Sequence, residues 1–159
     1  MEPAPPTKII RPAGPGDRDD WLKMRHQLWP DHANHEEDIR NYFARKKPNA
    51  GRVWLAFQGG QGIGFIEASI RDTAEGCLTS PVAYIEGWFV RKPWRQSGVG
   101  RSLLDTVETW AREQGLTELA SDCTLDNTDS AASHGSCGFA ETSRIITFKK
   151  ELHSNRMEK

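Results

Sequence analysis

The sequence predicts a mixed α/β fold built on one central sheet. Strand-like runs and amphipathic helical segments alternate along the 159 residues. A hydrophobic fraction of 36% and a charged fraction of 27% are typical of a globular chain. Neither an internal repeat nor a second domain is visible. We therefore expect one domain over residues 8–152, between flexible ends at 1–7 and 153–159.

The N-terminal half is predicted to supply a strand, two helices and a hairpin. Trp21, Met24 and Leu28 recur at helical spacing after Asp17, which is suited to cap a helix. Pro30 ends this helix or begins the next. The expected elements are a strand at 8–11, a turn at 12–16, helices at 17–29 and 36–45, a loop at 46–51, and strands at 52–58 and 63–70 joined by a glycine turn at 59–62.

The C-terminal half is predicted to alternate strands and helices. An apolar stripe that starts at Val99 and runs to Ala111 indicates one helix, and Gly115 is suited to end it. Ile145, Ile146 and Phe148 are the apolar members of a last strand. The expected elements are a loop at 71–81, a strand at 83–90, the helix from 99, a strand at 116–123, a helix from Asp126 or Asn127 to about 137, and a strand at 141–150.

Composition excludes several classes of function. The net charge of −1 gives no reason to expect nucleic-acid or membrane binding. No stretch has the length and apolarity of a signal peptide or a membrane span, so we expect a cytoplasmic protein. Three separated cysteines suggest neither a disulfide framework nor a metal site. His26, His32 and His35 lie close in sequence, but we interpret them as surface histidines of an acidic segment and expect no metal.

A basic loop with two glycines follows the strand at 83–90 and precedes a helix. Unpaired N–H groups and the helix dipole attract phosphate at such a helix start, and Gly98 and Gly100 permit close approach. An ordinary strand-to-helix loop explains this segment equally well when it is taken alone. The nucleotide-binding Walker pattern lacks its lysine here, and the dinucleotide fingerprint lacks its third glycine.

The loop sequence Arg95-Gln96-Ser97-Gly98-Val99-Gly100 resembles the Gln/Arg-x-x-Gly-x-Gly/Ala motif of the GNAT acetyltransferases. Cys137-Gly138-Phe139 resembles the Gly-Phe that this family places before its last strands. The resemblance implies the GNAT fold: a mostly antiparallel sheet with splayed fourth and fifth strands and helices on both faces. It also implies acetyl-CoA as cosubstrate, without a metal. The implied cofactor-binding residues are Trp88, Phe89, Val90, Arg95, Gln96, Ser97, Gly98, Val99, Gly100, Arg101 and Asn127.

Within this family, the chain looks most like the aminoglycoside 6'-N-acetyltransferases. The segments that carry this resemblance are Gln27–Pro30, Glu67–Arg71, Ser80–Val82, Glu86–Val90, Ala120–Asp122 and Asp126–Thr128. The chain departs from the pattern in two places: residues 72–75 lack a tyrosine of the relatives, and Ser143 stands where they carry a glutamate, with Glu141 two residues before it. Trp29, Glu86, Asp122, Glu141 and Ser143 are the implied substrate-binding residues.

A polycationic acceptor suits the charge of the N-terminal segment. Residues 17–38 carry seven acids and three bases, although a solvated helix face explains any single acid as well. Glu86 and Asp122 lie in or at the end of predicted strands, where an unpaired carboxylate is costly. The alternative to substrate binding is a structural ion pair with an arginine for Glu86 and Asp122. For Trp29, the alternative is a place in the hydrophobic core.

The implied reaction is direct acetyl transfer from acetyl-CoA to the 6'-amine of aminoglycosides, which confers resistance. Glu86 or Asp122 would accept the proton of the amine, and a backbone N–H near Val90 would polarise the thioester carbonyl. His134 stands where many relatives place a proton-donating tyrosine, although it fits a surface imidazole equally well. No serine or cysteine nucleophile is paired with a base.

Two other functions stay open on the sequence alone. The first is an acetyltransferase of this family for another amine, such as a polyamine or a protein N-terminus. The second is a non-catalytic acyl-CoA-binding module. The resemblance also implies a homodimer in which the last strands meet, for which residues 141–150 are sufficiently apolar.

Overall fold

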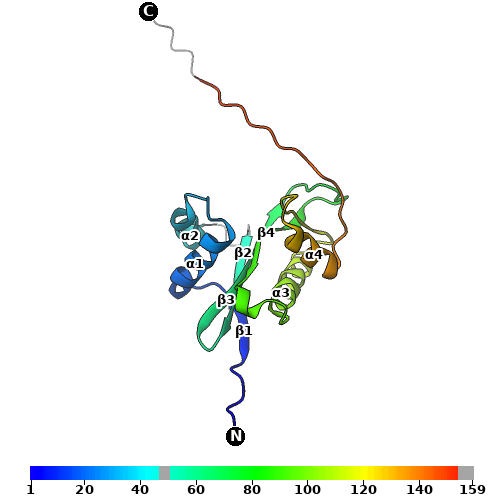
Figure 1. The fold of residues 1–159 in the computed structure, drawn as a ribbon. Helices are drawn as coiled ribbons and strands as arrows, with labels where there is room; N and C mark the ends of the chain where they lie inside the picture. Colours follow the sequence, from blue (N-terminus) through cyan, green and yellow to red (C-terminus); the bar gives the residue numbers. More distant parts are fainter. Residues whose placement is uncertain (47–50, 154–159) are drawn as a thin grey trace, which may run out of the picture.

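A five-stranded sheet forms the centre of the protein (Figure 1). The computed structural model describes residues 1–46 and 51–153. The strands lie in the order β1-β2-β3-β4-β5, with every pair antiparallel except the parallel pair β4–β5. Their bounds are Lys8–Pro12, Gly51–Gln58, Gln61–Arg71, Val82–Val90 and Leu119–Ser121. This architecture confirms the predicted mixed α/β fold with a mostly antiparallel sheet.

Helices cover both faces of the sheet (Figure 1). The short helix η1 (Pro15–Asp17), α1 (Arg18–Leu28) and α2 (His35–Ala44) lie on one face. Their buried side chains Trp21, Met24 and Ile39 pack against Leu55, Phe65 and other residues of the strands. The short helix η3 (Lys92–Trp94), α3 (Val99–Glu113) and α4 (Thr128–Ser136) follow β4 in the chain.

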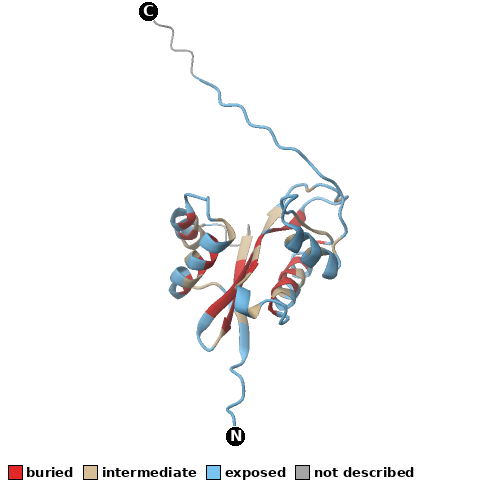
Figure 2. Cartoon of the chain, viewed as in Figure 1, coloured by how far each residue is buried: buried red, intermediate tan, exposed pale blue. Residues whose placement is uncertain are grey.

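The larger core lies between α3 and the other face of the sheet. The predicted stripe of α3, from Val99 to Ala111, is buried there against β2, β3 and β4 (Figure 2). Leu103, Leu104 and Val107 have no exposed surface. Because the two cores hold the sheet from both sides, β4 is a rigid support for groups on either of its faces.

Most predicted elements form close to their expected bounds. Gly59 and Gly60 both adopt positive φ, of 57° and 78°, as a two-residue hairpin turn between β2 and β3 requires. The strand expected at 116–123 is limited to Leu119–Ser121. Residues 47–50 of the expected loop and 154–159 of the expected flexible end lie outside the described residues. In the part that is described, no helix is long and apolar enough to cross a membrane.

The predicted last strand is wrong for the single chain. Residues 141–150 pair with no strand in the described part of the chain and run away from the body (Figure 1). Ile146 and Phe148 are 79% and 92% exposed. Alternating apolar residues indicate a strand that needs a partner, and the single chain offers this segment none among its described residues.

Candidate active site

The strands β4 and β5, the last pair of the sheet, separate partway along β4. They pair only from Ala83 with Leu119 to Ile85 with Ser121. Beyond Ile85, no described strand pairs with this edge of β4. The Arg91 N–H donates to Ile63 of β3, and N–H groups alternate in direction along a strand, so the Val90 N–H points into the gap. The expected splay of these two strands is therefore present.

The glycine loop lies at the end of β4, where α3 begins. Gln96 and Gly98 adopt positive φ, of 59° and 84°, and Gly98 caps α3. The Ser102 N–H donates the first hydrogen bond of the helix, to the Gly98 carbonyl. The N–H groups that precede it at the helix start have no acceptor within the helix. Apart from the chain neighbours of Gly98, no described atom lies within 4 Å of the place where its Cβ would stand. This open, donor-rich turn fits a pyrophosphate group.

Basic side chains surround this loop. Arg95 donates from Nε to the carbonyl of Val90 at 2.8 Å, and Lys8 donates from Nζ to that of Ser97 at 3.1 Å. Arg101 donates to the carbonyl of Ser136 at 2.9 Å and so connects α3 to α4. These contacts bring three positive charges to a short turn, which favours a polyanionic ligand such as the phosphates of coenzyme A.

His134 lies opposite β4 on α4. Its ring contacts that of Trp88 edge-on, with 5.4 Å between centroids. Its Nδ1 lies 2.7 Å from the Ser130 carbonyl oxygen, and because a carbonyl only accepts, Nδ1 is the donor. In the neutral ring, Nε2 is therefore unprotonated and accepts a hydrogen bond from Ser121 Oγ at 2.8 Å. The imidazole therefore links α4 to β5. Asn127 caps α4 through a hydrogen bond from the Ser130 N–H.

Trp29 lies against β4 on the face covered by α1 and α2. A Cβ added to Gly87 would stand 2.4 Å from Cη2 of the Trp29 indole, so the glycine permits this contact. Gly87 directly follows Glu86, at the start of the unpaired edge of β4. The predicted aromatic wall is thus next to the gap rather than deep in the core.

Glu86 is held by side chains of β3. Arg71 donates to it from Nε at 2.9 Å and from Nη2 at 2.6 Å, and the Ser69 hydroxyl adds a third bond. Burial opposes ionisation of Glu86, but the bonds from Arg71 and Ser69 outweigh it and lower its pKa. The arginine ion pair considered as the alternative for Glu86 is therefore present. Its side chain is still 34% exposed, so a ligand can reach it.

Asp122 follows β5 and is exposed. The Tyr84 hydroxyl donates to its Oδ1 at 2.8 Å, and the Arg71 guanidinium lies 3.5 Å from the centroid of the Tyr84 ring. Burial first, and then the bond to Asp122, raise the pKa of Tyr84 to about 12, so it stays a donor at neutral pH. The sequence assigns neither Arg71 nor Tyr84 to the site. Arg71 ends one of the segments that carry the resemblance, but its ion pair with Glu86 and the bond from Tyr84 to Asp122 depend on which strands lie side by side.

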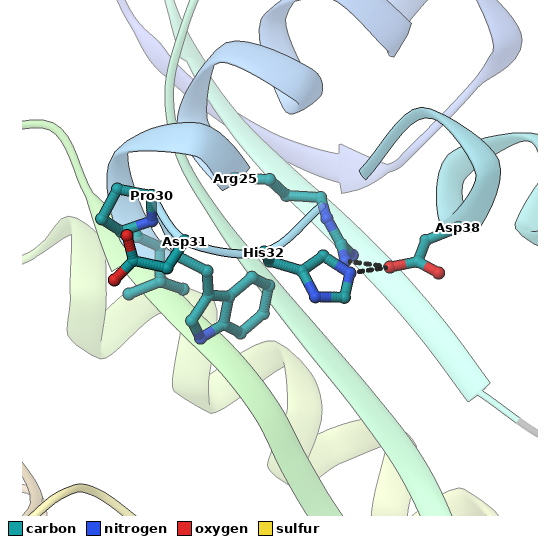
Figure 3. A pocket seen from close by; sticks show the side chains of 7 residues that line it. Arg25, Pro30, Asp31, His32 and Asp38 are labelled. Carbon is teal, nitrogen blue, oxygen red and sulfur yellow. Dashed lines mark hydrogen bonds and ion pairs between the residues drawn. The ribbon is translucent and has the colours of Figure 1, made fainter. Parts of the chain in front are cut away.

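A pocket of about 490 Å³ opens beside Trp29, between α1 and α2 (Figure 3). Arg25 and His32 converge on Asp38, with nitrogen-to-oxygen distances of 2.8 and 2.7 Å. Arg25 also donates to Glu67 of β3 at 2.6 Å. His26 and His32 are exposed as predicted, whereas His35 is only 1% exposed, so its assignment as a surface residue is wrong.

Two predicted substrate-binding residues lie apart from the others. Glu141 and Ser143 are exposed on the segment that leaves the body, and Glu141 pairs with Arg144. Neither makes a hydrogen bond to Trp29, Glu86 or Asp122. Trp29, Glu86 and Asp122, by contrast, all lie around the edge of β4 where the gap begins.

The part of the chain that contains the splayed strands and the glycine loop matches the sequence model of a known family. The model of the acetyltransferase (GNAT) family matches residues 18–139. The chain belongs to this family. The predicted family resemblance is thereby confirmed, and the matched residues include the whole loop from Arg95 to Gly100.

Individual relatives are similar over nearly the whole chain. An aminoglycoside N(6')-acetyltransferase type 1 of Stenotrophomonas maltophilia is 40% identical, over 90% of this chain and 93% of the relative. The crystal structure of AAC(6')-Ih from Acinetobacter baumannii, an aminoglycoside 6'-N-acetyltransferase, is 39% identical, with a TM-score of 0.84 over 92% of this chain and all of that one. AAC(6')-Iy, solved with the bisubstrate analogue CoA-S-monomethyl-acetylneamine, is 35% identical, with a TM-score of 0.84 over 92% of this chain and 99% of that one.

Proposed function

We propose that this protein transfers the acetyl group of acetyl-CoA to the 6'-amine of aminoglycosides and so confers resistance to them. The observation that carries the proposal is the arrangement around β4. An open turn with the N–H groups of a helix start lies at its end, and an indole and two carboxylates lie beside its unpaired edge. The aminoglycoside acetyltransferases that are similar over nine-tenths of the chain support the choice of acceptor.

The cofactor side of the site is proposed to act through backbone groups. Acetyl-CoA, when bound, supplies the thioester whose acetyl group is transferred. The turn from Gln96 to Arg101 would hold its pyrophosphate, and the edge of β4 from Trp88 to Val90 would pair with its pantetheine arm. Asn127 is proposed to contact the same molecule from the start of α4.

The acceptor side is proposed to bind a polycation. Trp29 offers a flat apolar wall, and Asp122 offers a carboxylate that Tyr84 orients. The attacking amine must be neutral, so Asp122 would accept its proton directly or through water. Glu86 would bind a further amine once that amine takes the place of the Arg71 guanidinium.

Two groups are proposed to assist at the thioester. The Val90 N–H points into the gap and would donate to the carbonyl oxygen as negative charge develops on it. The protonated form of His134 would give its Nε2 proton to the leaving sulfur, from the position where Nε2 now contacts Ser121.

The exposed C-terminal segment suggests a homodimer. Ile145, Ile146 and Phe148 are each at least 60% exposed, a large apolar surface for a short segment to leave in water. We propose that residues 141–150 pair with a second copy of the chain, which would also bring Glu141 and Ser143 to a sheet. Light scattering should give twice the monomer mass of 17.9 kDa. Phe148→Asp should shift the mass toward that of the monomer, and a monomeric wild type would refute the dimer.

An acceptor panel tests the proposed reaction. Thiol release from acetyl-CoA should be observed with kanamycin or tobramycin and should be far slower with spermidine or with a peptide that has a free N-terminus. Turnover with only the latter two would replace the aminoglycoside by another amine. Binding of acetyl-CoA without turnover of any acceptor would indicate a non-catalytic module.

A further inference from the structure

His35 is a buried histidine between the candidate acceptor wall and an arginine. It is the first residue of α2 and is 1% exposed. Its Nε2 lies 2.9 Å from the backbone carbonyl oxygen of Trp29, and its Nδ1 lies 3.2 Å from Nε of Arg25. Its ring is nearly parallel to the Trp29 indole, at 18° and 6.4 Å between centroids. One side chain thus contacts both the backbone and the ring of Trp29.

The two hydrogen bonds define the protonation state of His35. A carbonyl oxygen only accepts, so Nε2 must carry the proton. The Nε–H of an arginine only donates, so Nδ1 must be unprotonated. Burial, together with the charge of Arg25, lowers the pKa of His35 and keeps it in this neutral form.

Arg25, in turn, is fixed by two other elements. Its Nη1 donates to Glu67 on β3, which also accepts from Nε1 of Trp21 at 2.9 Å, and its Nη2 donates to Asp38 on α2 (Figure 3). Its guanidinium lies 5.0 Å from the centroid of the Trp29 ring. Because Arg25 is 7% exposed and held at three nitrogens, it is a rigid anchor.

Trp29 needs such an anchor because it lies beyond the end of α1. It is the C-cap residue, with φ of −128° and ψ of 73°, and its side chain lines the pocket between α1 and α2. We propose that His35 is a positioning residue for Trp29: it transmits the fixed position of Arg25 to the indole and so holds the acceptor wall against Gly87. This inference rests on the proposed role of Trp29 in acceptor binding.

Steady-state kinetics of His35→Phe test the inference. The substitution keeps an aromatic ring and removes both hydrogen bonds. The KM for kanamycin should rise by roughly three- to tenfold, the effect of one or two lost buried hydrogen bonds. The kcat and the KM for acetyl-CoA should stay unchanged, which a general loss of structure would not produce. His26→Phe is the matched control: His26 is exposed, its ring centroid lies 4.5 Å from that of the same imidazole, and its replacement should leave all three constants unchanged.

A double-mutant cycle separates the inference from the proposal on which it rests. In a Trp29→Ala background, adding His35→Phe should change the KM for kanamycin no further. An unchanged KM in Trp29→Ala alone would refute the proposed acceptor wall. A raised KM in Trp29→Ala together with an unchanged KM in His35→Phe would refute the positioning role alone.

A second variant covers the case in which His35→Phe does not fold. His35→Gln keeps an N–H that can donate to the Trp29 carbonyl but removes the ring beside the indole. The KM for kanamycin should therefore rise, by less than in His35→Phe. A wild-type KM in a folded His35→Gln protein would overturn the inference.

Discussion

The two sides of β4 are built in different ways. On the side of α3, the candidate cofactor site consists mainly of backbone groups: a turn with two positive φ angles, a helix start and an unpaired strand edge. On the side of α1 and α2, the candidate acceptor site consists of side chains, each held by another side chain. The first is specified by local sequence, whereas the second depends on contacts between distant elements.

This difference has a functional consequence. A backbone site for a common cosubstrate tolerates change in its side chains as long as its glycines remain. A site made of Trp29, Glu86 and Asp122 can alter its acceptor range through partners such as Arg71 that do not themselves bind the acceptor. We expect substitutions on the two sides of β4 to act on different kinetic constants.

The largest effect is expected from Asp122→Asn. The amide still accepts a hydrogen bond from Tyr84, so the geometry is kept while the proton acceptor is lost. The kcat for aminoglycosides should fall about 100-fold or more, as for other general bases, with the KM for acetyl-CoA unchanged. Asp126→Asn, at an exposed acid of the following loop, serves as the control. Wild-type turnover in Asp122→Asn would remove this carboxylate from the mechanism.

Gly98→Ala should affect the other side of β4. The left-handed conformation at Gly98, with φ of 84°, costs a non-glycine residue about 1–2 kcal/mol, so the KM for acetyl-CoA should rise roughly tenfold. The KM for aminoglycosides should not change. Gly115→Ala imposes the same strain, at φ of 76°, after the far end of α3 and should change stability alone. Equal kinetic effects of both variants would show that the loop has no special role.

Arg71→Gln should have a smaller effect, of opposite sign. Because the arginine occupies Glu86, its removal should lower the KM for aminoglycosides by up to about fivefold, the range of a partly exposed ion pair. Arg112→Gln, which breaks the exposed pair of Arg112 with Glu108 on α3, is the control. A raised KM in Arg71→Gln would mean that the pair supports the site rather than competing with the substrate.

The smallest effect is the pH dependence of stability that His35 contributes. Its pKa is lowered from 6.5 by burial, so the unfolded state binds the extra proton first as the pH falls. The contribution of neutral His35 to the free energy of unfolding is fully present above pH 6.5. It is lost as the pH falls toward the lower pKa of His35 in the folded state. The charged and titratable groups beside the ring are Arg25, His26 and His32, and Arg25 in turn donates to the carboxylates of Asp38 and Glu67.

Urea unfolding between about pH 5 and pH 8 measures this contribution. The stability difference between wild type and His35→Phe should shrink as the pH falls. His26→Phe should keep most of the wild-type slope, because burial is the main cause that lowers the pKa of His35 and the charge of His26 is a smaller one. A difference that stays constant with pH would show that His35 is not held in the neutral form.

The same contrast between local and distant contacts explains what could be predicted from the sequence. The glycine loop and the stripe of α3 follow from local spacing, and both have the predicted place. The ion pair of Arg71 with Glu86 and the burial of His35 depend on which strand and helix lie opposite, which no local pattern contains. The segment at 141–150 has the alternation of a strand, but alternation does not say which chain supplies the neighbouring strand.

The most direct test of the proposed reaction compares two acceptors that differ at one position. Neomycin carries an amine at the 6' position, and paromomycin carries a hydroxyl there. With wild-type protein and acetyl-CoA, mass spectrometry should show a single acetyl group added to neomycin, on the sugar ring that carries the 6'-amine. Paromomycin should give no comparable product. Equal acetylation of both antibiotics, or of neither, would contradict transfer to the 6'-amine.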